Sequence, residues 1–138
     1  MTQELTFKTN ALFEYVTYDK DTDSWNFVFE ENIAFSTQTI WRLLKNKNIK
    51  WVSLDNGQQF GLPIPVNLVE KLTSELTDKR LVEIKVKQDT ADLLLSLTDN
   101  LEIEIFISSS GYESYNFSVD KKNYIGMGSG DIAIFDNE

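Results

Sequence analysis

The sequence contains no cysteine and no histidine among its 138 residues. These absences exclude disulfide bonds, a thiolate nucleophile, a Cys/His zinc site and a Ser-His-Asp triad. Apolar runs such as Leu93–Leu95 are far too short to span a bilayer. The first ten residues lack the basic start and apolar run of a signal peptide, so we expect a soluble, cytoplasmic protein.

Basic side chains are also scarce, with 13 Lys and Arg against 22 Asp and Glu, for a formal net charge of -9. From residue 89 onward, only Lys121 and Lys122 oppose a long series of acids. Such a surface repels nucleic acid and anionic membranes and attracts basic proteins. A charge that merely keeps the protein in solution explains the same excess.

Hydrophobic residues make up 41% of the chain, and no repeat or linker divides it, so we expect one domain over residues 1–138. Period-two alternation of apolar and polar residues predicts that most of the chain is β-strand. In the segment 81–86 this alternation places Val82, Ile84 and Val86 on the inner face. The other expected strands are residues 12–18, 25–30, 33–35, 41–44, 49–52, 92–97, 101–107, 115–119 and 132–135.

One helix is predicted, at about residues 67–79. Asn67 can cap its start, with Glu70 three residues later. Its apolar residues recur on one side, which should lie on the sheet: Leu68, Val69, Leu72 and Leu76. The predicted fold class is therefore α+β, a predominantly antiparallel curved β-sheet with one packed helix.

Three alternating aspartates, Asp19, Asp21 and Asp23, are followed by Glu30 at the twelfth position of the same run. This is the ligand spacing of a calcium-binding EF-hand loop. However, Ser24 stands where that loop needs glycine, and the flanking residues alternate like strands. An acidic hairpin turn explains the segment better, and a small-ligand or calcium-binding domain remains the alternative function.

Glu102 and Glu104 project from the same face of a predicted strand, roughly 7 Å apart. Carboxylates at this spacing can catalyse hydrolysis. The opposite face is continuously apolar, so this face is better explained as the solvated side of a sheet. Phe106 adds an aromatic to that acidic face, a combination that suits protein binding.

The glycines of segment 126–130 precede a strand rather than a helix, and predict a turn instead of a phosphate-binding loop.

The chain contains one basic cluster, which consists of Arg42, Lys45, Lys47 and Lys50. Trp41 and Trp51 are interleaved with these basic residues. Single-stranded nucleic acid sites use such a mixture. The overall charge opposes that role, and ion pairs with the acidic half of the chain are the alternative.

Several short patterns occur in a recognisable order: Trp41-Arg42-Leu43, Asp55–Gly61, Ala91-Asp92-Leu93, Ser110–Tyr115 and a glycine-rich turn before residues 131–135. Together they resemble, over roughly residues 25–135, a group of small uncharacterised bacterial proteins that commonly have Trp where this chain has Tyr115. The resemblance implies an acidic immunity protein encoded beside polymorphic or contact-dependent toxins. It implies no catalytic residues.

We therefore expect a non-enzymatic binding protein, without cofactor, that neutralises a basic toxin domain and binds neither nucleic acid nor membrane. Gly111 is expected to adopt a special φ that presents its two successors at a sheet edge. The expected partner-binding residues share the acidic strand 101–107 and its flanking turns: Asp99, Glu102, Glu104, Phe106, Tyr112 and Glu113.

Overall fold

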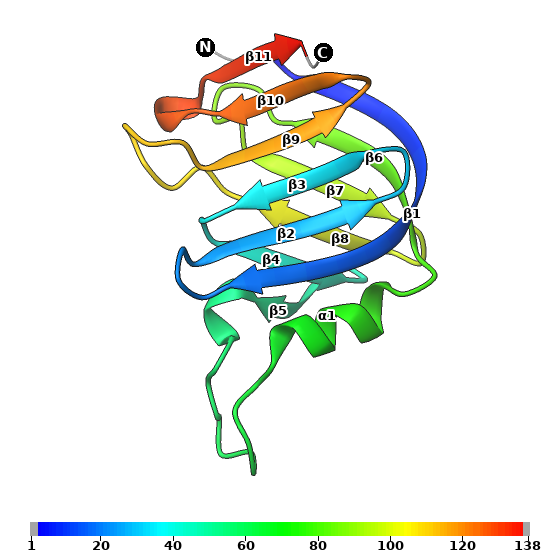
Figure 1. The fold of residues 1–138 in the computed structure, drawn as a ribbon, viewed down its shortest axis with the longest axis vertical. Helices are drawn as coiled ribbons and strands as arrows, with labels where there is room; N and C mark the ends of the chain where they lie inside the picture. The colour runs from blue at the N-terminus through cyan, green and yellow to red at the C-terminus, as the bar shows by residue number, and fades with distance from the viewer. Residues whose placement is uncertain (1–2, 137–138) are drawn as a thin grey trace.

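The computed structural model describes residues 3–136, which form eleven β-strands, one α-helix and two short 3-10 turns (Figure 1). The strands before the helix are β1 (Leu5–Asp19), β2 (Ser24–Phe29), β3 (Ile33–Thr37), β4 (Trp41–Lys45) and β5 (Asn48–Val52). The 3-10 turn η1 (Ser53–Asp55) and a long loop then lead to α1 (Leu68–Leu76). The remaining elements are β6 (Arg80–Val86), β7 (Leu93–Leu97), β8 (Leu101–Ile105), β9 (Tyr115–Val119), β10 (Lys122–Gly126), η2 (Gly128–Gly130) and β11 (Ile132–Asp136).

All the strands pair antiparallel in one open sheet, in the order β11-β10-β9-β3-β2-β1-β6-β7-β8-β4-β5. The first part of β1 pairs with β6 and its second part pairs with β2. The register shifts between Lys8 and Ala11, and again between Phe13 and Tyr15, and β1 curves around one end of the molecule (Figure 1). Strand β1 thus divides the sheet into two halves: the β2 half, with β2, β3, β9, β10 and β11, and the β6 half, with β6, β7, β8, β4 and β5. In the view of Figure 1 the β6 half lies behind the β2 half, and the core lies between them.

The core is rich in aromatic rings that join the two halves. Trp41 of β4 is fully buried and meets Trp25 and Phe27 of β2 edge to face, at ring-centroid distances of 5.0 and 5.4 Å. Within the β2 half, Phe35 stacks on Phe117 at 5.5 Å. These geometries are the ones that aromatic quadrupoles favour, and each pair adds to the free energy gained from burial.

Helix α1 packs against β1 at the lower edge of the two halves (Figure 1). The Asn67 side chain accepts a hydrogen bond from the Glu70 backbone N–H at 3.2 Å, so the predicted N-cap is confirmed. Three leucines of the predicted stripe are completely buried: Leu68, Leu72 and Leu76. The predicted class is confirmed in its coarse form, a mostly antiparallel sheet with one helix, although the helical part is small.

The helix ends at Leu76, three residues before the expected end, because Thr77 is extended and Asp78 has a φ of 68°. Within residues 3–136 no helix combines the length and the apolar composition needed to cross a membrane.

Several strand predictions need correction. Strand β1 begins at Leu5, well before the expected start at residue 12, and β8 ends at Ile105 instead of residue 107. Val82 is exposed instead of facing inward, because the β6–β7 register shifts between Leu81 and Glu83 and reverses the faces there. Strand β10 was not expected from the sequence. It follows a tight turn in which two non-glycine residues, Asp120 and Lys121, have positive φ, and so no Gly or Pro marks the hairpin.

Strands β1 and β6 are also joined by charge, since the Lys8 ammonium donates to the Glu83 carboxylate. This hydrogen bond lowers the pKa of Glu83 below its ordinary value, with smaller contributions from the charges of Lys8 and Lys85. A carboxyl group whose pKa is lower in the folded chain than in the unfolded chain stabilises the fold. This stabilisation is fully present at pH values above the unfolded-state pKa and is lost as the pH falls through the folded-state pKa.

Substituting Leu72→Ala should lower the free energy of unfolding by about 2–4 kcal/mol, because it removes buried methyl groups and leaves a cavity between α1 and the sheet. Urea unfolding measures the change. Ser74→Ala, at an exposed position of the same helix, should change stability by less than about 0.5 kcal/mol. Equal effects of the two substitutions would contradict the packing described for α1.

Substituting Glu83→Gln should lower the free energy of unfolding at neutral pH by less than about 1 kcal/mol, since the lost ion pair lies near the surface. The difference from wild type should close as the pH falls through the lowered pKa of folded Glu83, because the carboxyl group is then protonated in both states. Urea unfolding at several pH values tests this, and a difference that persists in acid would exclude the ionic explanation.

Candidate functional site

The loops at one end of the two halves converge, at the left in Figure 1. We call this the loop end; it comprises residues 20–23, 38–40, 53–55, 87–92, 106–114 and 127–131. Hydrogen bonds connect its segments. The Gln38 side chain donates to the Thr22 carbonyl at 2.9 Å, and the Ile107 N–H donates to Asp92 Oδ1 at 2.9 Å. The Ser129 N–H donates to the Ser109 carbonyl at 3.2 Å. Segments far apart in sequence therefore form one surface.

The loop end carries strong negative charge. Only Lys20 and Lys87 oppose its carboxylates, which are Asp21, Asp23, Asp55, Asp89, Asp92, Glu113 and Asp131. Within residues 3–136, none of these carboxylates takes part in an ion pair. The opposite end instead holds the ion pairs Lys79–Asp99 and Arg80–Glu30. Seven carboxylates against two lysines give the loop end a formal charge of -5, more than half of the -9 of the chain.

A wide, shallow cavity of about 500 Å³ lies at the loop end. Its lining combines the carboxylates of Asp89 and Asp92 with hydroxyl groups of Thr90, Ser129 and residues 108–110. Behind it, the Tyr115 hydroxyl donates to the Ala91 carbonyl at 2.9 Å. Burial, and to a smaller extent the charge of Asp92, raises the pKa of Tyr115, which keeps this phenol neutral. A cavity lined by carboxylates and hydroxyls suits an ammonium or guanidinium group.

Most of the expected partner-binding acids are paired within the chain. On β8, the Glu104 carboxylate lies 2.6 Å from Arg42 Nε, and the Glu102 carboxylate lies 2.9 Å from Lys47 Nζ. Asp99 is bound by Lys79, and this hydrogen bond lowers the Asp99 pKa below its ordinary value. These carboxylates neutralise neighbouring cations and are poor candidates for binding a basic partner.

Phe106 is similarly engaged, since the Arg42 guanidinium lies over its ring, 5.0 Å from the centroid. The remaining cations of the basic cluster contact acids as well. Lys45 and Lys50 both lie 3.7 Å from the Glu75 carboxylate of α1. The whole basic cluster is therefore paired with acids of the chain, as its second interpretation predicted.

Tyr112 and Glu113 do lie at the loop end, where Tyr112 is 82% exposed. The turn that presents them differs from the expected one, because Gly111 does not have a positive φ. Instead, the Ser109 hydroxyl accepts hydrogen bonds from the N–H groups of Gly111 and Tyr112, at 3.1 and 2.9 Å. A serine side chain can organise such a turn without a glycine at positive φ.

The carboxylates of the EF-hand-like run are separated. Asp19 and Asp23 flank the turn at the start of β2, where Asp23 accepts a hydrogen bond from Tyr18. Glu30 follows the far end of β2, roughly 20 Å away by strand rise. There it accepts a hydrogen bond from the Leu12 N–H at 2.9 Å. Asp19, Asp21, Asp23 and Glu30 therefore do not form one calcium loop, and no group of three or more acids in residues 3–136 is placed to hold a metal ion.

The glycine-rich segment forms the predicted turn, as η2. Gly130 has a φ of 87°, and a Cβ there would lie 2.4 Å from the Asp89 carbonyl oxygen. Gly130 is thus required for close backbone packing beneath the acidic cavity.

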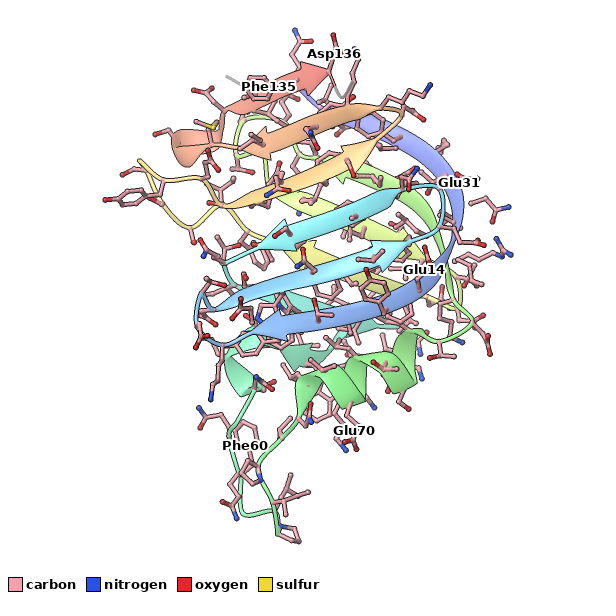
Figure 2. The ribbon with its side chains drawn as sticks, viewed as in Figure 1. Glu14, Glu31, Phe60, Glu70, Phe135 and Asp136 are labelled. Carbon is pink, nitrogen blue, oxygen red and sulfur yellow. The ribbon has the colours of Figure 1, made fainter. Side chains whose placement is uncertain are left out.

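A second exposed feature begins in the Asp55–Gly61 pattern, which was interpreted as a structured loop, either a site or a turn, but the exposure of its apolar residues was not predicted from the sequence. The loop between η1 and α1 projects below the sheets, with Phe60 near its tip (Figure 2). Its apolar side chains Phe60, Leu62 and Ile64 are exposed. The available signal was the absence of any charged residue between Asp55 and Glu70, in a chain in which 25% of residues are charged.

Comparison of the chain with family models, with curated proteins and with solved structures finds no match.

Proposed function

We propose that this chain is a non-enzymatic binding protein whose acidic loop end binds a basic toxin domain and neutralises it, the role of an immunity protein. The observation that carries the proposal is the set of carboxylates at the loop end that form no ion pair within residues 3–136. Charges left unpaired on one surface attract an oppositely charged partner and accelerate its association.

The cavity supports the same proposal at the level of chemistry. Asp89 and Asp92 lie in its lining with several hydroxyls, so a Lys or Arg side chain of the partner finds both a counter-charge and hydrogen-bond acceptors there. Tyr112, exposed in the same loop as the lining residues 108–110, is a suitable anchor, because tyrosine supplies a large contact area with few rotatable bonds.

The specific role as an immunity protein rests on the resemblance of the short sequence patterns to small acidic proteins encoded beside toxins. Two of these patterns contribute to the surfaces described above. Ser110–Tyr115 crosses the loop end, and Asp55–Gly61 leads into the projecting loop.

The direct experiment uses the purified C-terminal domain of the protein encoded immediately upstream, titrated with this chain at low and high salt. We expect a complex at low salt that weakens as salt rises, and rescue of cells that express the upstream domain. Absence of a complex at low salt, together with absence of rescue, would refute the proposal.

The double substitution Asp89→Asn and Asp131→Asn should lower the association rate at low salt by roughly tenfold, and the effect should shrink at high salt. Asn tolerates the positive φ of residue 89, so the fold is retained. Surface plasmon resonance measures the rates. The matched control, Glu14→Gln with Glu31→Gln, removes the same charge from exposed positions outside the loop end. If the control slows association equally, net charge rather than the loop end governs binding.

A further inference from the structure

The loop of residues 56–67, which we call the finger, projects from the lower end of the molecule beyond both halves (Figures 1 and 2). Its apolar side chains face solvent: Phe60 is 65% exposed, Leu62 47% and Ile64 72%. Other large apolar side chains are exposed as well, among them Ile49 and Phe135, but the finger gathers three of them within five residues, 60–64. Clustered exposure of large apolar side chains is unfavourable in water and is typical of interaction sites.

The finger is held in one shape at its base. The Gly57 N–H donates to the Val66 carbonyl at 2.8 Å, and the Val66 N–H donates to the Gln58 carbonyl at 2.8 Å. The Asn56 side chain accepts from the Leu68 N–H at 2.9 Å, which fixes the finger to the start of α1. Val66 is buried in the core. The base therefore belongs to the folded structure.

The tip is ordered as well. The Leu62 N–H donates to the Gln59 carbonyl at 2.7 Å, and the Gln59 side chain donates to the Leu62 carbonyl at 2.8 Å. Pro63 and Pro65 lack an N–H and restrict their own φ. These features lower both the polar desolvation and the conformational entropy that the tip would lose on entering an apolar site.

Backbone strain accompanies the display of Phe60. Its φ is 48°, in the left-handed region that bulky residues avoid, and Gly61 follows with a φ of 75°. Asn or Gly would satisfy this turn at lower cost. The Phe60 side chain is mostly exposed, so burial within the chain does little to offset the strain. Strain of this kind is concentrated at functional sites.

The charge of the chain argues against a membrane as the binding partner of the finger. The finger carries no Lys or Arg, and the chain has a net charge of -9 and an acidic loop end beside the base of the finger. Membrane-binding segments depend strongly on basic residues near the surface.

A second copy of the chain is also a poor fit. Three partly exposed side chains offer much less than the ~800 Å² per partner that a stable interface buries. A cavity of about 790 Å³ on the chain itself has charged residues in its lining, Glu31, Asp120 and Lys121, which makes it a poor site for the apolar tip of a second copy.

We propose that the finger inserts Phe60 and Ile64 into an apolar cleft of the same basic protein that the loop end attracts. This inference rests on the proposed function. The finger begins next to Asp55, at the lower part of the loop end in Figure 1, so a partner that binds residues 20–23 and 53–55 can also contact the finger. Charge then accelerates association, and the apolar anchors slow dissociation.

The test titrates the purified upstream C-terminal domain with the double variant Phe60→Ser and Ile64→Ser. We expect binding to weaken by roughly a hundredfold, mainly through faster dissociation, and to a similar extent at about 50 and 500 mM NaCl. The matched control is Ile49→Ser with Phe135→Ser, which removes apolar side chains of 57% and 55% exposure elsewhere on the surface. The control should bind like wild type.

Two further measurements identify the occupant. Because the chain has no cysteine, Ile64→Cys can be labelled at one site with an environment-sensitive dye, whose emission should shift to the blue in the complex. Membrane binding is measured with liposomes of phosphatidylcholine, with and without phosphatidylglycerol. Self-association of the chain is measured by analytical ultracentrifugation. We expect neither vesicle binding nor a dimer that depends on Phe60 and Ile64.

The outcomes separate the two proposals. If wild type and the finger variant bind the upstream domain equally, or the dye does not shift, the finger proposal fails while the proposed function stands. Vesicle binding or dimerisation that the finger variant abolishes also overturns the finger proposal. If wild type itself does not bind at low salt, both proposals fail.

A single substitution, Phe60→Asn, distinguishes a binding role from a structural one. Asn accepts the positive φ, so the melting temperature should rise by about 2–4 °C. Binding should weaken by roughly tenfold, because an anchor is lost. A lower melting temperature would show that Phe60 serves the fold.

Discussion

The strand β1 is the constraint on which the rest of the structure depends. Its first part pairs with β6 and its second part with β2, and two register shifts let it curve around one end of the molecule. Because a single strand belongs to both halves, the inner faces of the halves meet, and Trp41 of one half contacts Trp25 and Phe27 of the other. The same arrangement gathers loops from distant parts of the chain at the opposite end. Closure of the core and formation of the acidic surface are thus two consequences of one curved strand.

Charged residues are arranged differently on two parts of the surface. On the outer face of the β6 half, acids and bases alternate across neighbouring strands and neutralise one another, as in Arg42–Glu104 and Lys47–Glu102. Such exposed pairs contribute little stability, but they leave that face with little net field. At the loop end the carboxylates have no cationic partner within the described residues. With the uncharged finger beside it, the molecule combines a surface suited to long-range attraction with one suited to short-range apolar contact.

Alternation along the chain predicted most strands and their inner faces, because a half-buried strand must alternate, as Leu101, Ile103 and Ile105 show. The prediction failed where geometry departs from the regular period. A bulge exposes Val82, and the hairpin before β10 is formed by Asp120 and Lys121 without the glycine that would have revealed it. Of the expected partner-binding residues, Tyr112 and Glu113 lie at an exposed turn, whereas Asp99, Glu102 and Glu104 form ion pairs whose individual partners the sequence did not indicate. Cross-strand neighbours depend on strand order, which alternation does not encode.

The sequence by itself determined which residues are apolar, where the helix begins and how much negative charge the chain carries, since these are properties of composition and of local spacing. Only the tertiary structure decided which carboxylates are neutralised, because that depends on which strands become neighbours. It also decided that Phe60, Leu62 and Ile64 remain in solvent. Sequence can mark a segment as apolar, but whether that segment enters the core depends on whether the folded chain leaves a space for it.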